Sequence, residues 1–263
     1  MADQIRIGAL ISGGGTNLQA VMDACESCRI SGKIVFVGSD NARAPGLERA
    51  AARRIPTFVV DYAAVFNSFK QAPGQVRPPD DFDLNDIFLK QSLFTDRDDP
   101  AKVKSFLTCR AIAEAGLLEE MKPYPFDLLI LAGFMRNLTP YFIDRVNLPG
   151  GNPRIMNIHP ALLPAFPGVD GYGDTFRYGC KVGGCTVHFI DYGEDSGPII
   201  GQKAFQILEE DTLESVKEKG LKLEWQLYPE CIRLFAQGRL KIVRPEQTLA
   251  GAKKSARNVV KIL

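Results

Sequence analysis

The stretch IRIGALISGGGTNL, residues 5–18, decides the fold class of this chain. Its first half, Ile5–Ile11, is a nearly continuous apolar run, which is typical of a parallel strand covered by helices on both faces. A glycine-rich turn at residues 12–16 follows, and residues 17–25 carry a helical pattern. A strand that turns directly into a helix is the first unit of an alternating α/β fold.

The same alternation continues over the first 160 residues. We expect further strands at 33–37, 57–60, 127–132 and 154–158, with helices at 47–53 and 138–146. This order predicts an open, mostly parallel, Rossmann-like sheet with helices on both faces. Beyond Gly184 the pattern predicts strands at 185–190 and 199–208, a long helix at 212–236 and a strand at 239–243. We expect this C-terminal portion to be antiparallel.

We interpret residues 1–263 as a single domain with two additions. Residues 62–110 break the alternation, and their centre, 71–81, is rich in proline, glycine and aspartate, as in a loop. This segment is predicted to be an insertion on the scaffold, with a lid as one role. The tail, about 244–263, is basic, and we expect it to be peripheral.

Composition excludes several classes of protein. The 32 basic and 31 acidic side chains give a net charge of +1, so no overall basic field recruits nucleic acid. The longest strongly apolar stretch, residues 128–135, is too short to cross a bilayer. The N-terminus has no basic segment followed by a long apolar one, so we expect no signal peptide and a cytoplasmic protein.

The six cysteines raise the question of a metal site. Cys25 and Cys28 form a C-x-x-C motif, while Cys180 and Cys185 are more widely spaced. A zinc site would need two tight pairs or additional histidines. Because Cys25 also lies on the apolar stripe of a predicted helix, we favour ordinary buried thiols and expect no metal.

The glycine-rich turn predicts an anion site. Backbone N–H groups at a helix start attract anions, and glycine lets a ligand approach closely. Thr16 and Asn17 add side-chain donors. A dinucleotide fingerprint would need glycine in place of Leu18, and a P-loop would need a Gly-Lys-Ser/Thr sequence, which is absent. We therefore favour a phosphate monoester over a tight turn without a ligand.

Asn157 and His159 are the first candidates for catalysis. Residues two apart on a strand face the same side, and Pro160 ends the strand directly after them. The C-terminal edge of a parallel sheet is where open α/β folds bind ligands. An imidazole can carry a proton and an asparagine amide can stabilise an oxyanion, although a satisfied polar pair is the alternative. The other histidine, His188, lies inside a strand and is predicted to be structural.

Asp195 is the third candidate, in a loop between two predicted strands. We expect this loop to fold back over the cleft, so that Asp195 contacts His159, raises the pKa of its imidazole and fixes its orientation. A solvated acidic turn with Asp191 and Glu194 is the alternative. An amide, an imidazole and a carboxylate together suit acyl transfer without a covalent intermediate.

These motifs resemble those of the phosphoribosylglycinamide formyltransferases, folate-dependent enzymes of purine biosynthesis. The resemblance runs from Ile5 to about Val243, interrupted by residues 62–110, and rests on residues 11–18, 131–136, 156–164 and 186–198. The Asn-x-His-Pro element is similar across the wider formyltransferase superfamily. The glycine-rich Thr-Asn-Leu start is more specific to the glycinamide branch.

The resemblance implies a formyl transfer from 10-formyltetrahydrofolate to glycinamide ribonucleotide, and a role for each matching residue. It implies that Gly15, Thr16 and Asn17 hold the acceptor phosphate, that Glu224 meets the acceptor amine, that Asn157, His159 and Asp195 form a catalytic trio, that Met135, Arg136, Asn137 and Leu138 border the folate, and that Arg97 or Arg110 helps to bind it. The expected partners are small molecules, with no nucleic acid and no membrane, and a homodimer is left open. Another acceptor, a formyl-folate hydrolase or a non-catalytic folate- or nucleotide-binding regulator are the alternatives.

One departure from the family pattern is substantial. The family usually has histidines shortly after the Pro-Gly of the loop that follows the trio's strand, whereas here Pro167-Gly168 is followed by residues 169–174, VDGYGD. Gly183 also replaces a frequent histidine. We expect the proton transfer to depend on His159 and Asp195 alone, with Asp170, Tyr172 or Asp174 supplying hydrogen bonds or loop rigidity.

Overall fold

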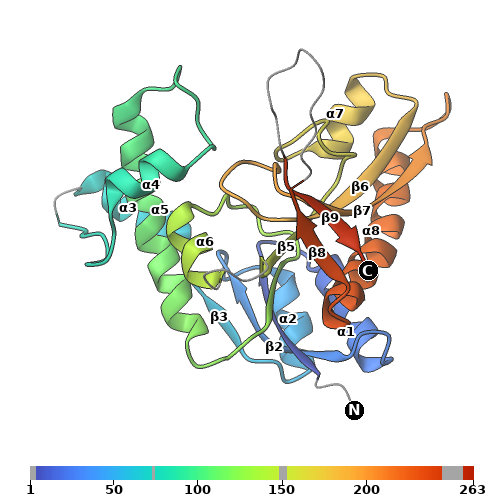
Figure 1. Ribbon diagram of the computed structural model, residues 1–263, viewed down its shortest axis with the longest axis horizontal. Helices are drawn as coiled ribbons and strands as arrows, with labels where there is room; N and C mark the ends of the chain where they lie inside the picture. Colours follow the sequence, from blue (N-terminus) through green and yellow to red (C-terminus); the bar gives the residue numbers. More distant parts are fainter. Residues whose placement is uncertain (1–3, 73–74, 148–152, 245–256) are drawn as a thin grey trace.

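The computed structural model describes residues 4–72, 75–147, 153–244 and 257–263. Its main sheet has seven strands in the order β3-β2-β1-β4-β5-β6-β7 (Figure 1). The strands are β1 (Ile5–Ile11), β2 (Gly32–Ser39), β3 (Thr57–Val59), β4 (Leu128–Leu131), β5 (Ile155–His159), β6 (Val182–Phe189) and β7 (Ile199–Gln206). The first five are parallel, and β6 runs antiparallel to both of its neighbours. The predicted fold class is confirmed.

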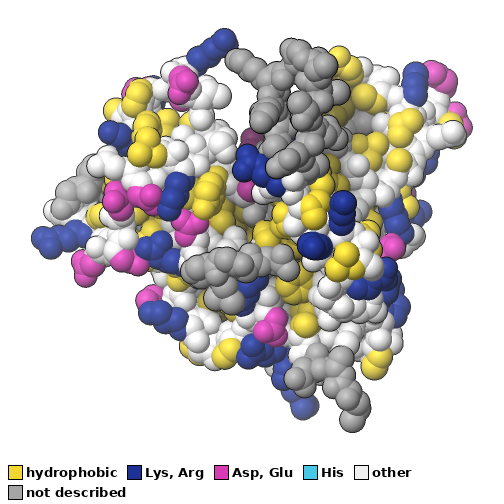
Figure 2. Space-filling model, viewed as in Figure 1, with side chains coloured by type: hydrophobic (Ala, Val, Ile, Leu, Met, Phe, Trp, Pro, Cys, Tyr) yellow, Lys and Arg dark blue, Asp and Glu magenta, His cyan; other side chains and the backbone are white. Residues whose placement is uncertain are grey.

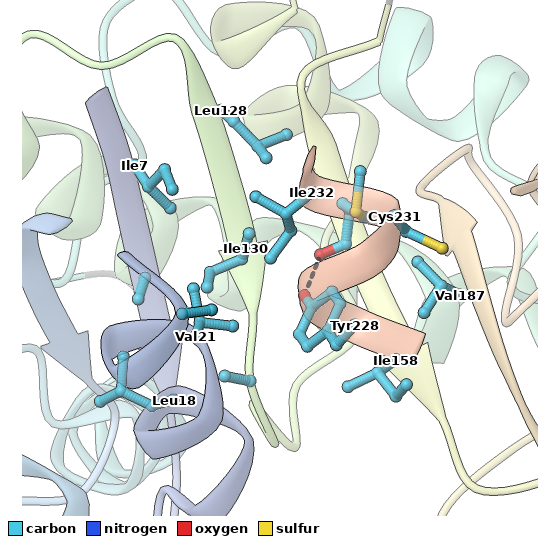
Figure 3. Packing of buried hydrophobic residues seen from close by; sticks show 14 of the residues in the cluster. Ile7, Leu18, Val21, Leu128, Ile130, Ile158, Val187, Tyr228, Cys231 and Ile232 are labelled. Atoms are coloured by element: carbon cyan, nitrogen blue, oxygen red, sulfur yellow. Dashed lines mark hydrogen bonds between the residues drawn. The ribbon is translucent and has the colours of Figure 1, made fainter. Parts of the chain in front are cut away.

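Helices cover both faces of this sheet because alternate strand residues point to opposite sides. One face is covered by α1 (Thr16–Glu26), α2 (Pro45–Ala52) and α8 (Leu213–Ala236). Ile7 and Ile130 pack there, in the cluster shown in Figure 3. The other face is covered by α5 (Pro100–Met121) and α6 (Pro140–Val146), where Leu10 and Leu129 pack.

Tyr228 ties α8 to the strands that carry the site. Its side chain is fully buried, and its hydroxyl lies 3.0 Å from the carbonyl oxygen of Leu131 and 2.8 Å from that of Met156. A buried phenol needs a hydrogen-bond acceptor, and here two carbonyls from adjacent strands share its one hydrogen. The contact fixes α8 against the last residue of β4 and the beginning of β5.

The segment at 62–110 is largely helical. It forms α3 (Tyr62–Gln71), α4 (Leu84–Lys90) and the first half of α5. Asp61, Asp83 and Asp99 each cap one of these helices with a side chain that accepts from a backbone N–H, a signal that the sequence carried but that we did not use. The lid role stays a prediction. Figure 1 shows α3 and α4 beside α5, away from the sheet.

The C-terminal tail contains a strand that the sequence analysis did not predict. The predicted short strand is β8 (Leu240–Val243), and β9 (Val259–Ile262) pairs with it in an antiparallel two-stranded sheet. Val260 packs against the core cluster, whereas the other three residues of β9 are exposed. The sequence signal was weak because β9 is short and mostly exposed. The rest of the tail, 245–256, lies outside the described residues.

The surface agrees with the near-zero net charge. Figure 2 shows Lys and Arg side chains interspersed with Asp and Glu over one face. Within the described ranges, no helix is both long and apolar enough to cross a membrane.

Glu114 joins α5 to the start of α6. Its carboxylate is fully buried and accepts hydrogen bonds from the backbone N–H of Thr139, at 2.7 Å, and from the Thr139 hydroxyl. Burial raises the pKa of Glu114 to about 8, and the two hydrogen bonds from Thr139 oppose this rise. Thr139 is the N-cap of α6, so this contact also anchors the segment that precedes α6.

We predict that Glu114→Gln removes a pH dependence of stability. A carboxyl whose pKa is raised in the folded state stabilises fully below its unfolded pKa and loses that contribution as the pH rises through the folded pKa, here about 8. The free energy of unfolding of the wild type should therefore fall relative to the variant between about pH 5 and pH 8, on the order of 2–4 kcal/mol. Urea denaturation at both pH values measures this. Glu119→Gln, an exposed change on the same helix, should leave the slope intact, and equal slopes for wild type and Glu114→Gln would refute the prediction.

Candidate active site

A cavity of about 350 Å³ opens near the C-terminal ends of β1, β4 and β5. The strand order reverses between β1 and β4, and crevices at such a point are where open α/β sheets bind ligands. Polar side chains from separate parts of the chain converge on the lining; they are Asn17, Asn157, His159, Asp195 and Glu224. The cavity therefore brings together the predicted trio and two of the predicted acceptor-binding residues, Asn17 and Glu224.

The glycine-rich turn is partly structural and partly open. Gly15 has a φ of 68°, and a Cβ there would lie 2.8 Å from the Cα of Gly46, so this position requires glycine. Arg49 donates from Nε to the Gly14 carbonyl at 2.8 Å. A Cβ on Gly13 or Gly14 would meet nothing within 4 Å. These two glycines therefore leave the backbone accessible to a ligand.

The three residues predicted to hold a phosphate lie in different surroundings. Asn17 points inward and donates from Nδ2 to Oε2 of Glu224 at 2.6 Å. Thr16 lines a shallow hollow beside Arg49 and Trp225. At the start of α1, Asn17 therefore lines the active-site cavity, whereas Thr16 lies in the hollow that contains the guanidinium of Arg49.

Glu224 is buried and accepts hydrogen bonds from two uncharged side chains. Besides Asn17, the hydroxyl of Tyr172 donates to Oε1 at 2.7 Å. Burial raises the pKa of Glu224, and these two hydrogen bonds oppose the rise. Tyr172 comes from α7 (Gly171–Arg177), in the segment that lacks the family's histidines. Gly220 makes room for it, since a Cβ there would lie 2.1 Å from the Tyr172 ring. Sequence reasoning named Tyr172 but not this partner.

Asn157 is oriented by a residue that the sequence analysis took to be structural. The register of β5 and β6 sets Asn157 opposite His188 and His159 opposite Thr186. The Nδ1 atom of His188 lies 2.9 Å from the Phe189 carbonyl, and its Nε2 lies 3.3 Å from Nδ2 of Asn157. In the neutral ring, Nδ1–H donates to the carbonyl and Nε2 accepts from Asn157. The sequence carried one sign of this role: Thr186 and His188 are polar residues two apart on a strand, so they face the same side.

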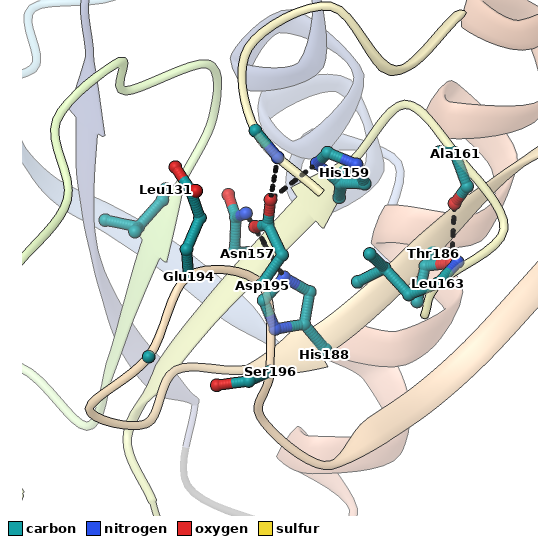
Figure 4. Close-up of polar contacts among 12 residues, drawn as sticks. Leu131, Asn157, His159, Ala161, Leu163, Thr186, His188, Glu194, Asp195 and Ser196 are labelled. Carbon is teal, nitrogen blue, oxygen red and sulfur yellow. Dashed lines mark hydrogen bonds and ion pairs between the residues drawn. The ribbon is translucent and has the colours of Figure 1, made fainter. Parts of the chain in front are cut away.

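Asp195 lies between the two histidines, as Figure 4 shows. Its Oδ2 is 3.2 Å from Nδ1 of His159 and accepts from the backbone N–H of Gly168 at 2.8 Å, while Oδ1 is 3.5 Å from Nε2 of His188. The predicted contact with His159 is confirmed. Burial works against ionisation, but the neighbouring imidazoles of His188 and His159 and the Gly168 donor hold the pKa of Asp195 below its usual value.

Asp195 raises the pKa of His159 as predicted, but the net shift is downward. The ring is only 3% exposed, and burial lowers its pKa although Asp195 and the Phe166 carbonyl, 2.8 Å from Nε2, favour the charged form. The negative charge of Asp195 favours the charged imidazole, but desolvation of the ring has the larger effect on its pKa. A neutral ring carries one hydrogen, which Phe166 and Asp195 compete to accept.

The four residues predicted to border a folate all line the cavity: Met135, Arg136, Asn137 and Leu138. The Nε atom of Arg136 lies 2.5 Å from Oδ2 of Asp40, and Asn137 donates from Nδ2 to Glu194 at 3.0 Å. Leucines and isoleucine form an apolar wall beside them, made by Leu93, Leu131, Leu138 and Ile190. Leu93 follows α4, and Ser92 beside it donates to the Tyr192 carbonyl at 2.9 Å, so this segment contacts the loop of Asp195.

The two candidate arginines are not in the cavity lining. Arg97 is exposed. Arg110 lies in a neighbouring hollow, where its guanidinium stacks 5.2 Å from the ring centre of Tyr62 and 4.8 Å from that of Phe106. Arg136 lines both spaces.

The cysteines form no cluster in the described part of the chain. Cys25 packs against the core and Cys28 is exposed. Among the described residues, no three His, Cys, Asp or Glu side chains are grouped to hold a metal ion.

Comparison with known proteins places the geometry in a family. Residues 5–232 match the family model described as formyl transferase. The chain is 33% identical over 237 residues to phosphoribosylglycinamide formyltransferase of Haemophilus influenzae, covering 90% of each chain. It is 33% identical over 242 residues to trifunctional purine biosynthetic protein adenosine-3 of Chironomus tentans, covering 90% of this chain and 14% of that longer protein. The crystal structure of glycinamide ribonucleotide transformylase 1 from Symbiobacterium toebii superposes with a TM-score of 0.71 at 37% identity, covering 100% of this chain and 96% of the other.

Proposed function

Because this chain belongs to the formyl transferase family, in the branch of the phosphoribosylglycinamide formyltransferases, we propose that it transfers the formyl group of 10-formyltetrahydrofolate to the amine of glycinamide ribonucleotide. The observation that carries the proposal is the convergence of Asn157, His159 and Asp195 in one cavity, whose lining also contains Glu224 and the apolar wall of Leu138. We assign the acceptor to the end with Glu224 and the donor to the end with the apolar wall. Both substrates are small molecules.

The acceptor end of the cavity suits an amine attached to a ribose phosphate. Glu224 is a buried carboxylate held by neutral donors and is available to a positively charged or hydrogen-bonding amine. The open backbone at Gly13 and Gly14, the start of α1 and the nearby Arg49 suit a phosphate. We therefore assign the phosphate to Gly15 and Thr16 and their neighbours, and assign Asn17 to the Glu224 side.

The donor end suits a flat heteroaromatic ring. Leu93, Leu131 and Ile190 supply apolar contacts, while Arg136 and Asn137 add polar side chains to the same lining. The folate supplies the activated formyl group on N10. Arg136 lies at the edge of this end, where the glutamate carboxylates of a folate need a cation.

The trio supplies the two functions that formyl transfer needs. The amine attacks the formyl carbon, and Asn157, oriented by His188, donates an N–H to the developing oxyanion. His159, neutral because it is buried, accepts the proton that the amine releases and delivers it to N10 as the carbon–nitrogen bond breaks. Asp195 stabilises the imidazolium formed in between. The formyl amide and tetrahydrofolate leave.

We predict that Asn157→Ala and His159→Ala each lower turnover by at least ~100-fold, because each removes a group that acts on the transition state. Purified protein, glycinamide ribonucleotide and 10-formyltetrahydrofolate are mixed, and folate absorbance reports the reaction. Circular dichroism controls for folding. A folded wild-type protein that binds folate but yields no formylated product would overturn the proposal in favour of a regulator or another acceptor, and hydrolysis without transfer would indicate a formyl-folate hydrolase.

The pH dependence tests Asp195 separately. If neutral His159 is the base, the acidic limb of kcat/KM lies below pH 6.5, because burial lowers the imidazole pKa. Asp195 favours the charged ring, so Asp195→Asn lowers the pKa further and moves this limb to lower pH. Profiles of both proteins between pH 5 and pH 8 measure the shift. A limb that stays in place would reduce Asp195 to a turn residue.

Tyr172→Phe tests the substitution in the segment without histidines. Loss of a hydrogen bond to a buried carboxylate costs about 1.5–3 kcal/mol, so the KM for the acceptor should rise about 10-fold or more. The KM for the folate should change little, because Tyr172 contacts the acceptor end. Tyr178→Phe, an exposed change directly after the same helix, is the matched control. Equal losses for both substrates would mean that Tyr172 only supports the fold.

A further inference from the structure

A second hollow, of about 900 Å³, lies between α3 and α5. Four cations line it: Lys70 from the last turn of α3, Lys102 from the first turn of α5, Arg110 and Arg136. Of the described residues in its lining, none is acidic. In a chain of net charge +1, with the two signs otherwise interspersed, this concentration of positive charge favours an anionic ligand.

The walls of the hollow are aromatic. Tyr62, Phe66, Phe69 and Phe106 contribute to the lining, and Phe66 is 56% exposed. The guanidinium of Arg110 is held between the rings of Tyr62 and Phe106, which limits the entropy it loses on binding a carboxylate. Such walls suit a ligand with apolar stems between its charges better than a compact ion.

The hollow lies next to the active-site cavity. Arg136 lines both spaces, and it belongs to the segment that we assign to the folate. A folate bound there has a p-aminobenzoyl group and glutamate carboxylates that extend away from the reacting formyl group. The side of the cavity marked by Arg136 borders this hollow, whose lining combines four cations with aromatic rings and has no acidic side chain among its described residues.

We propose that this hollow binds the oligo-γ-glutamate tail of the folate co-substrate, with Lys70 and Lys102 engaging carboxylates beyond the first glutamate. The inference rests on the proposed function, and it gives the helical segment at 62–110 a role in selecting long-chain folates. The methylene groups of each glutamate pack on the phenylalanine rings while the carboxylates meet cations from both helices. Because these ion pairs are partly exposed, the binding weakens as salt rises.

The experiment compares 10-formyltetrahydrofolate carrying one glutamate with the same compound carrying five. The wild type should have a KM about 5- to 10-fold lower for the five-glutamate form, the range that two or three partly exposed ion pairs supply. In the double variant Lys70→Gln, Lys102→Gln, the ratio of the two KM values should fall toward one. A wild type with equal KM values, or a double variant that keeps the full preference, would overturn the inference.

The matched control changes the same charge elsewhere on the same helical layer. Lys104, which stacks on Phe88, and Lys122, at the end of α5, lie outside the hollow. The double variant Lys104→Gln, Lys122→Gln should keep the wild-type ratio. A loss of preference here as well would show that overall charge, and not the hollow, selects the tail.

A binding measurement separates this inference from the proposed function. Titration calorimetry with p-aminobenzoyl-pentaglutamate needs no turnover, and binding should be lost in the Lys70→Gln, Lys102→Gln variant and weakened by 0.3 M salt. Turnover without binding or chain-length preference would remove the tail site and leave the proposed function intact. Binding without turnover would keep the site and remove the proposed activity.

Discussion

The antiparallel pairing of β5 with β6 is the constraint on which the site depends. It sets Asn157 opposite His188, so that the imidazole can fix the amide, and the connection from β6 to β7 then returns Asp195 to His159. A slip of one residue would turn every side chain of β6 to the other face of the sheet. Tyr228 joins α8 to β4 and β5, because its hydroxyl contacts the carbonyls of Leu131 and Met156 in these adjacent strands.

A second feature of the structure is that two carboxyl groups are buried and accept hydrogen bonds from uncharged donors. Glu224 and Glu114 are both buried carboxyls that receive hydrogen bonds from amide, hydroxyl or backbone groups, and burial raises the pKa of both. Glu114 serves the fold by anchoring α6, while Glu224 faces the cavity. A carboxyl without a resident cation retains most of its attraction for an incoming amine, which is the property an acceptor site requires.

Two parts of this chain depart from the family pattern described above, the segment of Tyr172 and the insertion at 62–110. Tyr172 reaches Glu224 only because Gly220 has no side chain in its path. The helical segment between β3 and β4 places Leu93 in the cavity and lines the basic aromatic hollow next to it. Under the proposed function, both features would meet the substrates away from the trio and would adjust their binding without changing the reaction.

The sequence alone determined the α/β alternation, the strand end at Asn157 and His159 and the proximity of Asp195, because these depend on local periodicity, on proline and glycine, and on where parallel strands must end. It did not reveal the role of His188, the division of the start of α1 between Asn17 and Thr16, or the partner of Tyr172. Those depend on register and on contacts between residues 31, 207 and 52 positions apart in the pairs Asn157–His188, Asn17–Glu224 and Tyr172–Glu224. The sign of the pKa shift at His159 was likewise decided by tertiary structure, because the desolvation that outweighs Asp195 is a property of the packed interior and not of any neighbour along the chain.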